Sequence, residues 1–122
     1  MESGNLELSF ISWNVNKGLR QKLKDPEFVN IVNNYDIICL LECWVSENDQ
    51  IELEGYEQHI FPRSKGRGGG IAIFYKSNLS HRVSIVENIL NTIVWIKITG
   101  SDLSKPIFIA VCYLPPESSV FL

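Results

Sequence analysis

The sequence predicts an α/β (α+β) fold in which a mixed β-sheet is flanked by a helix. Most apolar residues fall in short runs bounded by Gly, Asn, Ser and Pro, which is typical of strands. One segment near the N-terminus instead has the apolar spacing of a helix, and it lies between two strand-like runs. With 122 residues, 45% of them hydrophobic, the chain has the length of one domain and can bury a sizeable core.

The N-terminal third of the chain predicts a strand, a helix and a second strand. Residues 6–14 open with the alternation of a strand and end in polar residues. Asp25 and Pro26 are typical of a helix N-cap and first helical position, and an apolar face at helical spacing follows. Residues 36–43 are nearly all apolar, which predicts a strand buried on both faces. In a strand, helix and strand unit of this kind, the second strand almost always runs parallel to the first.

The remaining residues predict strands joined by short turns, and the short spacing favours antiparallel neighbours. The helix would cover one face of the sheet. Ile37, Cys39, Ile93 and Trp95 make the other face apolar as well, and the sequence predicts no second helix to cover it. We therefore expect that a layer of the fold is missing. The expected strands are residues 57–61, 71–75, 82–87, 92–99 and 107–114.

Composition points to the cell interior. Three cysteines without C-x-x-C spacing fit reduced thiols better than a disulfide framework or a zinc site. The first six residues have no secretory signal, and the longest apolar run, residues 107–114, is too short to cross a bilayer. We expect an intracellular protein, nuclear or cytoplasmic, that is not secreted and has no membrane partner.

Basic residues are concentrated in two segments, although the net charge is −3. If the two segments meet in space, they form a local site for phosphates on an otherwise acidic protein. The alternative is two solvated loops. The first segment holds Lys17, Arg20, Lys22 and Lys24, and the second holds Arg63, Lys65, Arg67, Lys76 and Arg82.

Two polar residues follow the predicted parallel strands. Asn14 ends the first and Glu42 ends the second, so both should lie at the sheet edge where open sheets bind ligands. An amide oxygen and a carboxylate are suitable ligands for magnesium, which completes its coordination with waters and substrate phosphate. In the alternative reading, Asn14 caps a turn and Glu42 forms a salt bridge with a lysine.

The glycine-rich segment at residues 66–70 is not a nucleotide-binding loop, because it leads into a strand rather than a helix. Its glycines would let the backbone turn sharply or approach another chain closely. Arg63, Lys65 and Arg67 could then contact a nucleic-acid backbone, unless the segment is a plain hairpin loop. His59 and His81 have no acidic sequence neighbour, and we expect surface or packing roles for both.

Four segments together resemble the endonuclease/exonuclease/phosphatase family, and most closely the apurinic-like endonuclease domains of non-LTR retrotransposons. They are "ISWNVNKGLR", "DIICLLECW", "GRGGGIAIFYK" and "IAVCYLPPESS", in the family's order. The resemblance implies half of a four-layered α/β/β/α sandwich. It also implies hydrolysis of phosphodiester bonds in DNA with Mg²⁺ (or Mn²⁺).

The resemblance also assigns residues. Glu42 matches the metal-binding glutamate and Asn14 the asparagine that supports the metal and phosphate. Asn16 falls where many family members carry an aspartate, Tyr113 matches the active-site tyrosine, and Arg67 would lie on a loop close to substrate. Lys17 and Cys43 depart from the usual pattern.

The family's later Gly-Asp-x-Asn and Ser-Asp-His motifs do not occur in these 122 residues. We therefore expect residues 1–122 to be a single partial domain, the N-terminal half, with little or no catalysis alone. Its partners would be the C-terminal half or a reverse transcriptase domain in a longer polyprotein. The alternatives are a non-catalytic module that binds nucleic acid or protein, and a related phosphatase.

Overall fold

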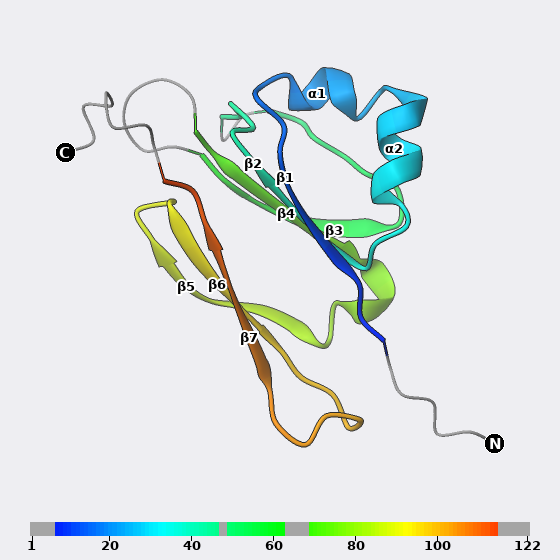
Figure 1. Cartoon of the computed structure of the whole chain (residues 1–122), viewed down its shortest axis with the longest axis vertical. Coiled ribbons are helices and arrows are strands. Elements are labelled where there is room, and N and C mark those ends of the chain that lie inside the picture. The colour runs from blue at the N-terminus through cyan, green and yellow to red at the C-terminus, as the bar shows by residue number, and fades with distance from the viewer. Residues whose placement is uncertain (1–6, 47–48, 63–68, 115–122) are drawn as a thin grey trace.

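The fold consists of two β-sheets packed face to face, with helices outside the first sheet (Figure 1). It was established as a computed structural model that describes residues 7–46, 49–62 and 69–114. The elements are β1 (Phe10–Asn14), α1 (Leu19–Lys22), α2 (Pro26–Val32), β2 (Ile37–Leu41), β3 (Tyr56–Phe61), β4 (Ile71–Lys76), the 3₁₀ turn η1 (Ser77–Leu79), β5 (Val83–Ile89), β6 (Ile93–Ile98) and β7 (Ile107–Cys112).

The first sheet contains the predicted strand, helix and strand unit. Its strand order is β1-β2-β4-β3, with β1 parallel to β2 and the other pairs antiparallel. The N-terminus of α2 is the predicted one, because the Asp25 carboxylate accepts the Glu27 N–H at 3.0 Å and Pro26 follows as the first helical residue. Four of the five residues of β2 are buried, as expected for a strand with a layer on each face.

The sequence did not predict helix α1. Gly18 precedes it with φ 75°, a left-handed conformation that costs glycine little, and Leu19, the first residue of the helix, is buried. Four residues complete about one helical turn. Apolar periodicity cannot reveal so short a helix.

The predicted α/β (α+β) fold class is confirmed, but the strands form two sheets rather than one, because β5, β6 and β7 form a separate antiparallel sheet. Ile37 and Cys39 of β2 belong to the same buried cluster as Val94 and Ile96 of β6. The second sheet therefore covers the apolar face that the sequence left uncovered. The opposite face of β2 packs under the helices in a second cluster, which includes Ile38, Leu40, Phe28 and Val32.

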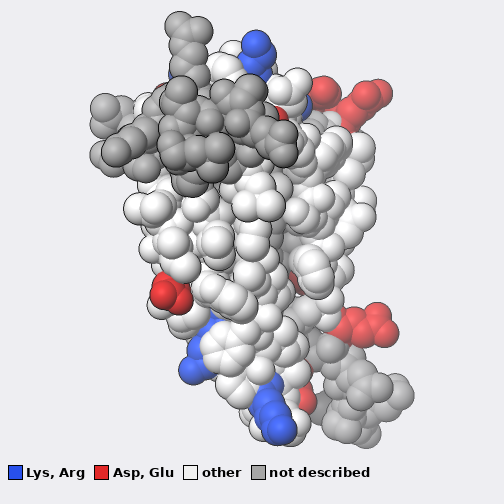
Figure 2. Space-filling view, turned by 60° about the vertical axis from the view of Figure 1, so that its left-hand side comes forward, with Lys and Arg blue, Asp and Glu red and all other residues white. Residues whose placement is uncertain are grey.

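The outer face of the second sheet is the apolar surface that no described helix covers. Burial alternates along β6, so that Ile93 and Trp95 are half-buried on the outer face while their neighbours point inward. Val86 and Phe108 are 48% and 54% exposed. Figure 2 turns this side forward and shows few charged groups over its middle. Of the four residues expected on one uncovered face, Ile93 and Trp95 lie on this outer face, whereas Ile37 and Cys39 are covered by the second sheet. In the described residues, no helix is long and apolar enough to span a membrane.

Asp36 ties the start of β2 to the segment before β1. Its carboxylate accepts hydrogen bonds from the Ser9 N–H at 2.9 Å and the Ser9 hydroxyl at 3.2 Å, and it lies 3.4 Å from the Lys76 ammonium. Burial by itself raises the pKa of Asp36, but the hydrogen bonds from Ser9 and Lys76 outweigh burial and hold the pKa below its ordinary value of 3.8.

We predict that Asp36→Asn makes stability less sensitive to acid. A carboxylate with a depressed folded pKa contributes stability above its unfolded pKa, and this contribution is lost as pH falls through that value and below. Urea unfolding at neutral pH and below about pH 4 should show a smaller acid-induced loss for Asp36→Asn than for the wild type. Glu54→Gln, at an exposed position, should behave as the wild type. Equal acid sensitivity of Asp36→Asn and the wild type would contradict the assignment.

We also predict that the three thiols differ in reactivity. Burial raises the pKa of Cys39 and of Cys43 to about 12, whereas Cys112 is exposed on β7. Because the thiolate is the reactive form, a disulfide reagent at mildly alkaline pH should label Cys112 first, and the other two only on unfolding. Mass spectrometry of timed samples would identify each site, and rapid labelling of Cys43 in the folded protein would contradict the prediction.

Candidate metal and phosphate site

Asn14 and Glu42 lie at the same edge of the first sheet, as the parallel order predicts. Asn14 pairs with Leu41, the last residue of β2. Beyond this pair, the Val15 N–H donates to the Leu41 carbonyl at 2.9 Å and the Lys17 N–H donates to the Glu42 carbonyl at 2.7 Å. The two chain segments therefore stay paired past the ends of their strands, and the asparagine and the glutamate remain neighbours.

The backbone of Glu42 has the left-handed conformation, with φ 55°. For a non-glycine residue this conformation costs about 1–2 kcal/mol. Two hydrogen bonds hold it, from the Cys43 N–H to the Gly70 carbonyl at 3.2 Å and from the Trp44 N–H to the Gly69 carbonyl at 2.9 Å. Strain that the surroundings enforce in this way is often found at functional sites.

Gly69 and Gly70 have the role that the sequence suggested for such glycines, a close approach of two backbones. Their φ values are 71° and 90°. A Cβ atom on Gly70 would lie 3.6 Å from the Trp44 nitrogen. The end of β2 is therefore packed against the start of β4 through backbone atoms, which fixes the direction in which Glu42 leaves the sheet.

Tyr113 connects this edge to the second sheet. Its hydroxyl donates to Glu42 Oε1 at 2.9 Å, across 71 residues of sequence. Tyr113 directly follows β7, and its own N–H donates to the Thr92 carbonyl at 2.8 Å. Because Tyr113 is buried and Glu42 is half-buried, this hydrogen bond helps to compensate the carboxylate for lost hydration.

Part of the alternative interpretation of these residues holds in the structure. Asn14 Oδ1 accepts the Asn16 N–H at 3.0 Å, so Asn14 does cap a turn, and Asn16 has φ 50°. Glu42, in contrast, forms no ion pair with any described residue. Its Oε2 atom accepts no hydrogen bond from the described residues and is available to a ligand.

The donor set fits a hard cation only in part. The Glu42 carboxylate and the Asn14 amide oxygen are the kinds of ligand that Mg²⁺ accepts, and this ion usually keeps several waters and binds through one or two carboxylates. The described residues contain no group of three or more His, Cys, Asp or Glu side chains that could hold a metal. The described residues therefore offer a partial ligand set.

Among the described residues, Lys17 and Lys22 of the first basic segment lie near the site. The Lys17 ammonium lies 5.5 Å from the centre of the Trp44 ring, and the Lys22 ammonium donates to the Lys17 carbonyl at 3.1 Å. The sequence did not anticipate the Lys17–Trp44 contact. This contact depends on the left-handed backbone of Lys17 (φ 62°) and Trp44 (φ 53°), which no local sequence motif predicts.

The second basic segment does not join the first where the structure describes it. Lys76 forms an ion pair with Asp36 at the opposite end of the sheet. Arg82 lies 2.8 Å from Asp102 and also donates to the Thr99 carbonyl, at the end of the second sheet away from Tyr113. Arg63, Lys65 and Arg67 lie outside the described residues, so their predicted contacts with substrate stay predictions.

The histidines are exposed, as expected. His59 on β3 shares a hydrogen bond of 2.9 Å with the Tyr75 hydroxyl, and His81 precedes β5. No described contact joins either of them to Glu42 or Asn14.

Two facing sheets, with a carboxylate and an amide at the ends of parallel strands, define an α/β domain whose first sheet carries two candidate metal ligands at one edge. The chain belongs to the Endonuclease/Exonuclease/phosphatase family, whose model matches residues 11–118. No curated protein matches the sequence. The crystal structure of the Xenopus laevis APE2 catalytic domain is similar, with a TM-score of 0.64 and 17% identity over 89% of this chain. The match covers 46% of the APE2 chain, so the fold corresponds to part of the family's sandwich.

We predict that Tyr113→Phe leaves the fold intact but lowers the free energy of unfolding by about 1–2 kcal/mol, because it removes a hydrogen bond to a half-buried carboxylate. Tyr35→Phe is the matched control, since the Tyr35 hydroxyl makes no hydrogen bond with the described residues. Urea unfolding of the two variants would measure the difference. Equal stability of the two variants would show that the Tyr113 hydroxyl contributes nothing.

Proposed function

We propose that this chain forms part of a divalent-metal-dependent phosphodiesterase, a DNA endonuclease domain of the kind found in non-LTR retrotransposons. The observation that carries the proposal is Glu42. It follows β2, in which four of five residues are buried, and its own backbone is strained. Its carboxylate is held by Tyr113 from the other sheet, and it adjoins Asn14. Family membership supports the reaction class, and the resemblance of four sequence segments supports the retroelement origin.

Mg²⁺ or Mn²⁺, held by Glu42 with support from Asn14, would polarise the phosphoryl oxygens and stabilise the charge that develops on them. Tyr113 is a positioning residue in this proposal. Its hydroxyl proton is directed at Glu42 Oε1, which fixes the rotamer of the carboxylate and leaves Oε2 for the ligand. Asn16 keeps Asn14 oriented through the hydrogen bond from its backbone N–H.

Phosphate binding would draw on the basic residues near this edge. Lys17 and Lys22 lie beside the site, and we propose Arg63, Lys65 and Arg67 as further contacts to the DNA backbone. Such contacts position the duplex without reading its sequence. They would favour DNA as the substrate over small phosphoesters.

The proposal assigns part of the catalytic machinery to another region of a longer protein. The sequence lacks the Gly-Asp-x-Asn and Ser-Asp-His motifs, which would supply the water-positioning residue and the catalytic histidine. We propose that residues 1–122 act with a C-terminal half, and with a reverse transcriptase domain, in a nuclear or cytoplasmic polyprotein.

A second candidate is a non-catalytic module that binds nucleic acid or protein. It is favoured by one observation, that the described residues hold no metal-binding group of three or more side chains. Such a module would keep the basic surface and the sheets but would not turn over substrate.

We predict that a protein extended through the two later motifs nicks supercoiled DNA in the presence of Mg²⁺. Glu42→Ala in that protein should lower the nicking rate by about 100-fold or more, since it removes a charged group from the reacting centre. The 122-residue chain alone should nick weakly or not at all. Glu87→Ala, at an exposed position on β5, is the matched control and should nick as fast as the unaltered protein.

Equal nicking by the Glu42→Ala and Glu87→Ala variants would refute the metal role of Glu42. A folded extended protein that binds DNA without nicking it, with or without Mn²⁺, would favour the binding module instead.

A further inference from the structure

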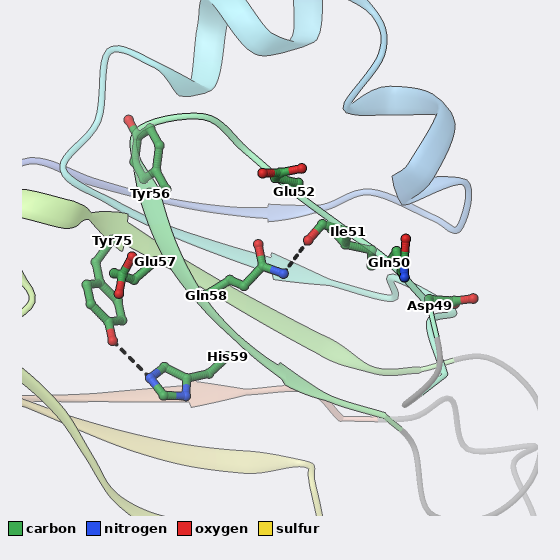
Figure 3. A pocket seen from close by; sticks show the side chains of 9 residues that line it. All are labelled: Asp49, Gln50, Ile51, Glu52, Tyr56, Glu57, Gln58, His59 and Tyr75. Atoms are coloured by element: carbon green, nitrogen blue, oxygen red, sulfur yellow. Dashed lines mark hydrogen bonds between the residues drawn. The ribbon is translucent and has the colours of Figure 1, made fainter.

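A groove of about 750 Å³ runs along β3, the edge strand of the first sheet. Residues 49–52, strand β3 and Tyr75 of β4 form it (Figure 3). The stretch at residues 49–52 passes on the side of Tyr56 and Gln58, and the Glu57, His59 and Tyr75 side chains lie on the other side of the strand. The groove belongs neither to the Glu42 edge nor to the outer face of the second sheet.

The backbone of β3 has unpaired groups that face this groove. The Ser77 N–H donates to the Gly55 carbonyl at 2.9 Å, so in this antiparallel pair the backbone groups of Gly55, Glu57 and His59 point toward β4. Those of Gln58 and Ile60 then point outward. No described backbone group pairs with them. An unpaired row of this kind is a template for another strand.

The side chains around this edge carry negative charge. Asp49 and Glu52 lie on one side of the strand and Glu57 lies on the other (Figure 3). None of the described residues that line the groove is a Lys or Arg. A strand added here would direct alternate side chains to the two sides, and both sides would favour cations.

Hydrogen bonds hold the walls in place. The Gln58 amide donates to the Ile51 carbonyl, the Tyr56 hydroxyl donates to the Tyr35 carbonyl at 2.6 Å, and His59 is joined to the Tyr75 hydroxyl at 2.9 Å. Ile51 and Tyr56 also pack in or against the buried cluster below the helices. A preformed groove loses little conformational entropy when a partner binds.

We propose that the β3 edge is a docking site for an extended, Lys- or Arg-rich segment of a partner protein, which adds to the first sheet as a fifth strand. The Gln58 and Ile60 backbone groups would supply main-chain hydrogen bonds, as in other cases of strand addition. Asp49, Glu52 and Glu57 would select for basic side chains. The unpaired edge sets the extended conformation of the partner, and the three carboxylates set its charge.

The test uses the whole chain and a fluorescent peptide in which pairs of adjacent Lys alternate with pairs of Thr, so that both sides of the added strand carry Lys. We expect this peptide to bind, and the same peptide with Glu in place of Lys not to bind. Two N-methylated versions separate strand addition from simple charge attraction. Methylation of the alternate N–H groups that face β3 should weaken binding at least tenfold, whereas methylation of the opposite set should change binding little.

Single substitutions in the protein test the charges. Glu52→Gln and Glu57→Gln should each weaken binding by about threefold or more. Glu54→Gln is the matched control, because Glu54 is exposed between them but does not line the groove. All three positions are exposed, so the variants should fold.

Three results would overturn the proposal. They are no binding of the Lys peptide, equal binding of the two N-methylated peptides, and equal binding by the Glu52→Gln, Glu57→Gln and Glu54→Gln variants. None of these outcomes depends on nuclease activity.

Discussion

Burial of both faces of β2 is the constraint on which the rest of the structure depends. A strand of five apolar residues, four of them buried, requires a packed layer on each side. The helices provide one layer and the second sheet provides the other. Such a strand can present polar groups only where it ends. The position of Glu42 therefore follows from the burial of β2, and the parallel partner β1 brings Asn14 to the same edge.

Much of the fold could be predicted from local sequence. The helix N-cap at Asp25 and the parallel unit depend on neighbouring residues and on general chirality, and both are confirmed. The separation into two sheets was not predictable in the same way. Along β6 both faces carry apolar side chains, Ile93 and Trp95 outside and Val94 and Ile96 inside. The sequence pattern therefore could not show which of these residues would meet β2.

Only the location of the candidate site, at one edge of the first sheet, was predictable from the sequence. Parallel order places Asn14 and Glu42 together, but the Tyr113 contact joins residues far apart in sequence, and only the family resemblance singled out that tyrosine. The left-handed backbone at Glu42 was not predictable either, because it is imposed by the carbonyls of Gly69 and Gly70. The assigned roles of these residues in metal and substrate binding stay predictions.

The hydrogen bond between Tyr113 and Glu42 also has a consequence for folding kinetics. Strands β5 and β6, and strands β6 and β7, are neighbours in sequence, so each pair forms by closing a short loop. The Tyr113–Glu42 hydrogen bond instead joins residues 71 positions apart. Loop-closure entropy delays contacts of large sequence separation. The second sheet can therefore form early as an independent meander, and the candidate metal site is completed only when that meander docks on β2. The hydroxyl of Tyr113, rather than its backbone N–H, which bonds to Thr92 within the second sheet, would then report the last step of folding.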